Sequence, residues 1–292
     1  MSLSKVFFES FNGAVEAAYD AYFRIAEKDI LKGLSSKEGE LDGYLRNETL
    51  RWAGTSLSEL DGMTPGEYVD SVDEPEELVT MFREGAILCD ADLPGIFLDR
   101  LHSFGSTAVE ALLGLCRDVP LSGADEESLM APLMAVQVLG GWKAPEAVGV
   151  LIGMLDYRGE ASDLLYEKVR AALISIGKPA VESMLAAMES QDPDSPQAEN
   201  LVMALSDAAR GSGPEAVYRR LKSAFLNMSN KAVGAYCLGN YGDGRAIPAL
   251  RGYLLKNRGN ISKETYFDVL SAIKRLGGSA EDLENPGGRG GL

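Results

Sequence analysis

One pattern recurs through the last two-thirds of the chain and limits the folds that it can adopt: an apolar helix, a short glycine turn and a second apolar helix. The clearest copy, residues 231–254, reads KAVGAYCLGNYGDGRAIPALRGYL. Glycines near the end of the first helix provide the backbone freedom that ends a helix. Asp243 is a residue type that caps the next helix, and Pro248 lies just inside it, where a missing N–H costs least. The stretch therefore predicts a helix–turn–helix unit.

Each helix of this unit has apolar residues at helical spacing, which predicts one buried face per helix. In the first helix we expect this face to contain Ala232, Val233, Tyr236 and Cys237. In the second helix we expect it to contain Ala246, Ile247, Leu250 and Leu254.

Weaker copies of the unit occur upstream, and a shortened copy follows downstream. They lie at residues 97–116, 133–155, 168–188, 201–225 and 266–283. We assign their turns to Gly105, Gly140, Gly177, Gly211, Gly239 and Gly277, which are 28 to 38 residues apart. A single helix pair cannot bury both of its apolar faces, so pairs of this length stack in register. We predict an all-α fold, a right-handed α–α superhelix (solenoid) of about five full two-helix units and a partial sixth.

The turn also has a recognisable composition: Leu-Gly, a short Gly/Asp turn, then Ala-Val/Ile-Pro-x-Leu. The pattern is carried by Leu238, Gly239, Gly242, Asp243, Arg245, Ala246, Ile247, Pro248, Ala249 and Leu250, and in part by Ile176, Gly177, Pro179, Ala180 and Val181. It resembles the HEAT-like repeat of the type found in the phycobilin lyase group, and the resemblance covers about residues 93–283. It implies the superhelical fold but no single role, since such scaffolds serve many functions. Tetratricopeptide repeats are the architectural alternative, but their spaced Trp-Leu-Gly/Tyr signature is absent.

The N-terminal third is helical in pattern but outside the repeat period. Its first 30 residues carry an unusually aromatic apolar stripe, and the sequence TPGE at residues 64–67 has the signals of a helix start with a capping box. A solenoid needs its first hydrophobic face covered, so we predict that residues 1–90 form a helical cap. The alternative is a separate partner-binding module built on Phe7, Phe8 and Phe11.

The remaining boundaries follow from composition. Residues 91–284 form the repeat region. Residues 285–292, NPGGRGGL, contain four glycines and no apolar periodicity, so we predict a disordered tail.

Charge is distributed unevenly along the chain. The whole chain has a net charge of −16, whereas residues 201–292 contain 13 Lys and Arg against 8 Asp and Glu. In a stacked array, equivalent helices lie side by side, so these cations and the tyrosines between them predict a basic stripe on the concave face. The stripe comprises Tyr218, Arg219, Arg220, Lys222, Arg245, Arg251, Tyr253, Lys256 and Arg258, and is continued by Lys274 and Arg275. Since the overall acidity opposes nucleic acid, we expect a protein or acidic peptide as its partner.

Residues suited to catalysis are scarce. The single histidine, His102, cannot form a multi-histidine metal site, which excludes the di-iron chemistry of HEAT-like deoxyhypusine hydroxylases. The three cysteines are widely spaced and form no CxxC motif, so we expect buried thiols in a reducing cytoplasm. No phosphate-binding loop, export signal or membrane span is recognised.

These observations favour a non-enzymatic scaffold without a cofactor. Three alternatives stay open from the sequence. The first is a phycobilin-lyase-like enzyme or chaperone factor that holds a tetrapyrrole in the groove, or another HEAT-like enzyme. The second is a solenoid that binds nucleic acid, as HEAT-like DNA glycosylases do. The third is self-association of the acidic N-terminal half with the basic C-terminal end.

Overall fold

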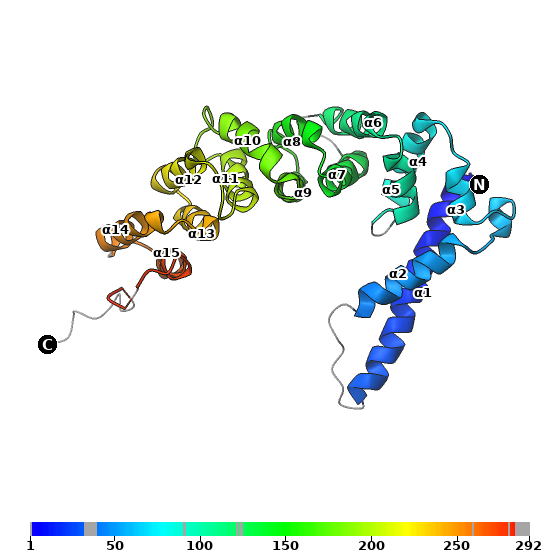
Figure 1. The fold of residues 1–292 in the computed structure, drawn as a ribbon, viewed down its shortest axis with the longest axis horizontal. Coiled ribbons are helices and arrows are strands. Elements are labelled where there is room, and N and C mark those ends of the chain that lie inside the picture. Colours follow the sequence, from blue (N-terminus) through cyan, green and yellow to red (C-terminus); the bar gives the residue numbers. More distant parts are fainter. Residues whose placement is uncertain are drawn as a thin grey trace. The chain divides into compact units, whose positions relative to one another are not determined.

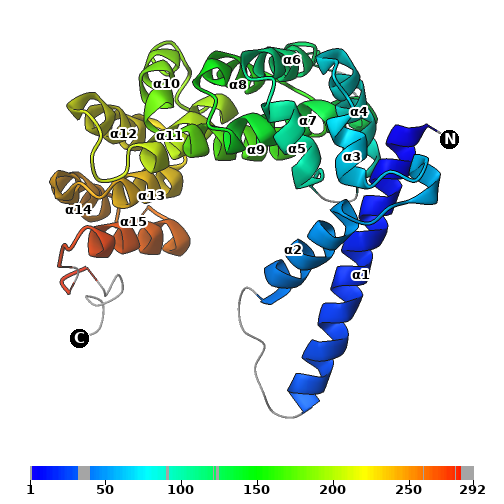
Figure 2. The same cartoon turned by 45° about the vertical axis from the view of Figure 1, so that its right-hand side comes forward.

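The structure is a computed structural model that describes residues 2–31, 40–89, 92–120, 122, 125–258, 260–279 and 281–283. These residues form fifteen α-helices and four short 3-10 segments, with no β-strand among them (Figures 1 and 2). The predicted all-α class is therefore confirmed. The predicted tail, residues 285–292, lies outside the described residues.

Contacts divide the chain into two compact units. Unit 1 comprises Met1–Leu115 and Asp125–Ala135, and unit 2 comprises Cys116–Ala124 and Val136–Leu292. The boundary predicted at residues 90 and 91 falls inside unit 1, so the helix pair at residues 97–116 groups mostly with the N-terminal helices.

Unit 1 is built on a long N-terminal helix and the shorter helices that contact it. Its elements are α1 (Leu3–Leu31), α2 (Glu40–Ala53), η1 (Ser58–Leu60), α3 (Pro65–Asp70), α4 (Pro75–Leu88), α5 (Gly95–His102), α6 (Ser106–Arg117) and the first part of α7 (Glu126–Gly141). α1 contacts α2, η1 and α4. α3 begins at the predicted capping box, in which the Thr64 hydroxyl accepts from the Glu67 amide and the Glu67 carboxylate accepts from the Thr64 amide.

Three phenylalanines of α1 contribute to the core of unit 1. The side chains of Phe7 and Phe8 are completely buried and that of Phe11 is nearly so. Phe7 lies 5.2 Å from Trp52 and Phe8 lies 5.5 Å from Phe97, measured between ring centroids. The alternative of a partner-binding module built on Phe7, Phe8 and Phe11 is therefore wrong: these rings are inaccessible because they hold α1 to its neighbours.

Unit 2 contains the end of α7 and eight further helices. They are α8 (Val148–Met154), α9 (Ser162–Ile176), α10 (Val181–Ala187), α11 (Pro196–Ala208), α12 (Glu215–Asn227), α13 (Lys231–Tyr241), α14 (Ile247–Asn257) and α15 (Lys263–Arg275). The 3-10 segments η2 (Pro145–Ala147), η3 (Lys178–Ala180) and η4 (Gly244–Ala246) precede α8, α10 and α14.

These helices form two layers. α9, α11, α13 and α15 contact one another in order and make the first layer, which lies on the inside of the bend of unit 2 in Figures 1 and 2. α8, α10, α12 and α14 make the second layer, and each contacts a helix of the first. Helices adjacent in a layer are therefore about one predicted repeat apart in sequence.

The predicted turn glycines have two different roles. Gly177, Gly211 and Gly277 have positive φ angles of 73°, 71° and 81°, as a turn after a helix requires, and Gly105 in unit 1 has one of 57°. Gly140 and Gly239 instead lie inside α7 and α13, so their assignment as turn residues is wrong. A Cβ atom at Gly140 would lie 2.7 Å from the Cα of Ala172, and one at Gly239 would lie 3.1 Å from the Cα of Ala272. Gly140 thus lets α7 approach α9 closely, and Gly239 lets α13 approach α15 closely.

Apart from Gly239, the turn after α13 has the residues and roles that the sequence predicted. Gly242 ends α13 in the left-handed conformation, with φ 87°. The Asp243 carboxylate then accepts a 2.9 Å hydrogen bond from the Arg245 amide, which caps η4. Pro248 lies in the first turn of α14.

Candidate partner-binding site

Among the described residues, no helix combines the length and apolar character needed to cross a membrane. That same part of the chain holds no cluster of three or more His, Cys, Asp or Glu side chains placed to ligate a metal. His102 is the exposed last residue of α5. Burial raises the pKa of the thiols of Cys116 and Cys237 to about 12, so both are neutral and poor nucleophiles.

The predicted basic stripe lies on the second layer of unit 2 and not on the first layer at the inside of its bend, so the location predicted for it, the concave face, is wrong. α12 carries Tyr218, Arg219, Arg220 and Lys222; η4 carries Arg245; α14 carries Arg251, Tyr253 and Lys256; and Arg258 follows α14. The structure brings three of these residues together. The Arg245 guanidinium lies 4.3 Å from the centre of the Tyr218 ring, and the Lys222 ammonium lies 6.0 Å from it. The Tyr218 hydroxyl donates a 2.9 Å hydrogen bond to the Arg245 carbonyl.

Several stripe cations already have partners within the chain. Arg245 pairs with Glu215 at 2.9 Å and with Asp243 at 2.6 Å. Arg219 also approaches Glu215, at 3.7 Å. The hydrogen bond from Arg245 holds the pKa of Asp243 below its usual value, as expected for an ionised pair. These acids offset much of the positive charge that would attract an anionic partner.

The other stripe residues contact separate parts of the chain or are exposed to solvent. Arg251 pairs with Asp282 at 2.6 Å, and Arg220 donates to the Met188 carbonyl. Tyr253 lies edge-on to Phe225, with 5.4 Å between ring centroids. Lys256 and Arg258 are exposed. The nine residues thus occupy one layer without forming a single cluster, and binding through them stays a prediction.

A groove on the first layer is a second candidate site. It spans α11, α13 and α15 and encloses about 470 Å³. Its lining residues are Met203, Ala232, Val233, Tyr236, Asp268, Ser271, Ala272 and Arg275. The short side chains on α13 and α15 leave the hollow between longer neighbours, and Gly239 brings the two helices together one turn further along.

The two sides of the groove differ in chemistry. α13 contributes the apolar residues Ala232, Val233 and Tyr236, at the i, i+1, i+4 spacing of one helix face. Tyr236 is 43% exposed, although the sequence pattern placed it in the core. That expectation fails for Tyr236 because α13 is apolar on nearly all sides, so periodicity does not identify the buried face. Cys237 is buried as predicted, and Leu238 and Tyr241 are buried with it.

α15 contributes the polar side. Asp268, Ser271 and Arg275 are exposed and follow one helix face at i, i+3 and i+7. The Arg275 guanidinium lies 5.3 Å from the centre of the Tyr236 ring, a cation–π contact that joins the two sides. Of the sequence-predicted cations, Arg275 is thus the one that lines this groove. The sequence grouped Arg275 with the stripe, but α15 belongs to the first layer, whereas α12 and α14 belong to the second. Charge pattern alone does not distinguish the two layers.

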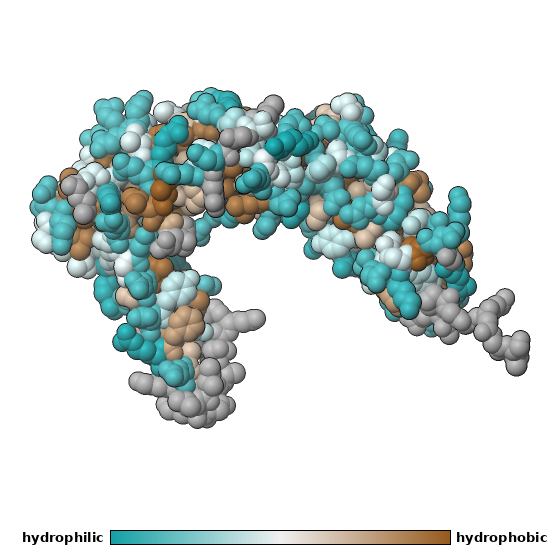
Figure 3. Space-filling model, turned by 180° about the vertical axis from the view of Figure 1, so that it is seen from behind, coloured by the Kyte–Doolittle hydropathy of each residue, from teal (hydrophilic) through white to brown (hydrophobic). Residues whose placement is uncertain are grey.

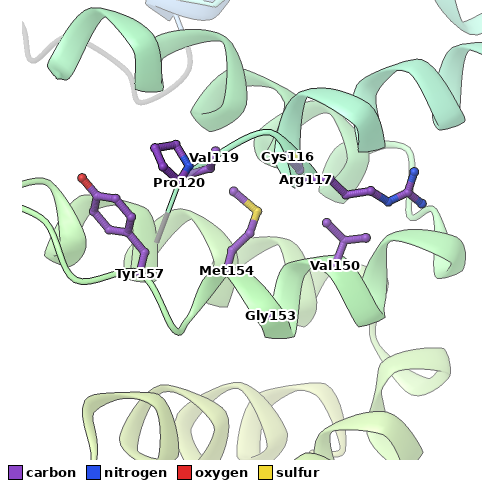
Figure 4. Close-up of a pocket in the computed structure, with 8 residues that line it drawn as sticks. All are labelled: Cys116, Arg117, Val119, Pro120, Val150, Gly153, Met154 and Tyr157. Atoms are coloured by element: carbon purple, nitrogen blue, oxygen red, sulfur yellow. The ribbon is translucent and has the colours of Figure 1, made fainter. Parts of the chain in front are cut away.

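A smaller hollow of about 240 Å³ lies within unit 2 (Figure 4). It is lined by Cys116, Arg117, Val119, Pro120, Val150, Gly153, Met154 and Tyr157. The Tyr157 hydroxyl has no hydrogen-bond partner among the described residues. It lies close to Gly159 and, in Figure 4, points away from Met154. Without polar groups that converge on the hollow, it has little to orient a small molecule.

The face of the molecule in Figure 3 is mostly hydrophilic, and its hydrophobic side chains form small separate areas. A large apolar patch therefore does not mark an interaction surface on that face. No protein-family model matches the chain, and no curated protein is significantly similar to it.

Proposed function

We propose that the chain is a non-enzymatic scaffold of HEAT-like two-helix repeats, wound as a right-handed superhelix, that binds a protein or peptide partner. The two-layer order of unit 2 supports the repeat architecture. A similar glycine–alanine contact also occurs twice, between Gly140 of α7 and Ala172 of α9 and between Gly239 of α13 and Ala272 of α15. The buried thiols of Cys89, Cys116 and Cys237 fit a reducing compartment such as the cytoplasm.

The groove on α11, α13 and α15 is the single observation that carries this proposal. It combines an exposed aromatic ring at Tyr236 with apolar side chains and with charges at its edge. Buried aromatic anchors with a polar rim are the usual composition of a protein-binding site. We therefore place the partner on the first layer, and propose that residues 1–90 act as the N-terminal cap.

Affinity capture from the native lysate at low salt tests the site. The bait is the full chain, compared with Tyr236→Glu in the groove and with Leu226→Glu on α12. Leu226 is 55% exposed in the second layer, so it is a matched control for an added surface charge. We expect the native chain and Leu226→Glu to retain the same partner, and Tyr236→Glu to lose it, with unchanged circular dichroism for all three.

The outcome also distinguishes the groove from the basic stripe. A variant with Arg219, Arg220, Arg245 and Arg251 changed to Glu reverses the stripe while leaving the groove intact. If that variant loses the partner and Tyr236→Glu retains it, the stripe is the binding surface and the groove assignment is wrong.

A further inference from the structure

Two opposite charges at the groove have no partner within the described part of the chain. Asp268 and Arg275 both line the groove, and neither forms an ion pair or a hydrogen bond with another described residue. The Arg275 guanidinium lies over the Tyr236 ring. Its N–H donors are therefore available to an incoming group.

Elsewhere in unit 2, several exposed charges are paired within the chain. Arg219, Arg245 and Arg251 each contact a carboxylate, and Asp207 contacts both Arg210 and Asn240. Asp268 and Arg275 have no such partner among the described residues. They also lie at one site, together with the accessible hydroxyl of Ser271.

The spacing of the two charges sets the size of a complementary ligand. Asp268 and Arg275 are seven residues apart on α15, which corresponds to about 10 Å along the helix axis. Apolar side chains of Val233 and Tyr236 form the opposite side of the groove. A ligand that satisfies all of these groups carries both signs of charge with an apolar group between them.

We propose that the groove recognises an amphipathic segment of a partner protein in which an apolar anchor residue lies between a basic and an acidic residue about 10 Å apart. The basic residue pairs with Asp268 and the acidic residue with Arg275, whose planar guanidinium suits a bidentate carboxylate contact. The anchor rests on Val233 and Tyr236. A nucleic-acid backbone is a poor fit because Asp268 would oppose its phosphates. This inference rests on the proposed function and specifies the chemistry of the partner.

Selection from a phage-displayed library of random peptides tests the proposal. The full chain is the target, and Tyr236→Glu removes peptides that bind elsewhere. We expect enriched peptides to carry a basic and an acidic residue on opposite sides of an apolar residue. Against Arg275→Glu the acidic residue should no longer be enriched, and against Asp268→Lys the basic residue should no longer be enriched. Arg46→Glu on α2, an exposed site in unit 1, should leave the consensus unchanged.

A consensus peptide then gives a quantitative test by fluorescence polarisation. Charge reversal at either groove position should weaken binding by about tenfold or more, because like charges would face each other. Enriched peptides that depend on Tyr236 but lack the two flanking charges would overturn this inference and leave the proposed function intact. Failure to enrich any peptide that depends on Tyr236 would contradict the proposed function itself. Equal weakening by Arg46→Glu would show unspecific charge attraction and overturn the inference.

Discussion

At the scale of single residues, glycine shows what a sequence pattern can and cannot predict. The regular recurrence of glycine after apolar helices correctly indicated turns at Gly177, Gly211 and Gly277. The same recurrence misassigned Gly140 and Gly239, which serve helix packing. A glycine near a helix end is compatible with both roles, a turn and a close helix contact. Which role it has depends on the residue that faces it in the neighbouring helix.

Gly140→Ala tests the packing role. The added methyl group would lie 2.7 Å from the Cα of Ala172, where backbone cannot move aside cheaply, so we expect the free energy of unfolding to fall by about 1–3 kcal/mol. Gly141→Ala is the matched control, because its Cβ would meet no atom within 4 Å. Urea unfolding followed by circular dichroism should show the control as stable as the native chain or more so. Equal stability of the two variants would argue against the close approach.

The Asp243–Arg245 pair makes a prediction about pH. The Arg245 hydrogen bond lowers the folded-state pKa of Asp243 below its ordinary value of 3.8. The pair therefore stabilises the fold above about pH 4, and this contribution is lost as pH falls through the lowered pKa. Asp243→Asn retains a capping side chain without the charge. Its stability deficit relative to the native chain should be constant near neutral pH and disappear in acid. A deficit that persists unchanged into acid would contradict the electrostatic account.

At the scale of elements, α1 has two halves with different surroundings. Phe7, Phe8 and Phe11 in the first half are buried against the other helices of unit 1. In the second half, Tyr19 and Phe23 are 37% and 59% exposed. The sequence predicted the helix and its aromatic stripe, but periodicity carries no information on how far along the helix its neighbours extend.

Phe7→Ala and Phe23→Ala measure this difference on the same helix. Loss of the Phe7 ring removes contacts with Phe8, Trp52, Tyr68 and Phe97 and should cost about 3–5 kcal/mol of unfolding free energy. Phe23→Ala should change it by about 0.5 kcal/mol or less. Thermal or urea unfolding of the full chain gives both values, and a similar cost for the two substitutions would contradict the burial described for α1.

At the scale of the whole molecule, hydrophobic periodicity and turn residues sufficed to predict an all-helical chain. They placed a boundary at residues 90 and 91, whereas unit 1 extends to Leu115 and includes Asp125–Ala135, since the division depends on which helices contact one another and not on the repeat period. The groove was also beyond the sequence. It arises where the short side chains of Ala232 and Ala272 lie beside the long ones of Met203 and Arg275, and these four residues come from three helices.

Site-specific photo-cross-linking most directly tests the claim that the first layer of unit 2 binds a protein partner. The photoreactive residue p-benzoylphenylalanine replaces Tyr236 in the groove, a conservative aromatic exchange, or replaces Leu226 on α12 as the control. After irradiation in native lysate, adducts are identified by mass spectrometry. The account predicts a discrete protein adduct at position 236 that is absent at position 226. Adducts at position 226 alone, or the same adducts at both positions, would contradict it.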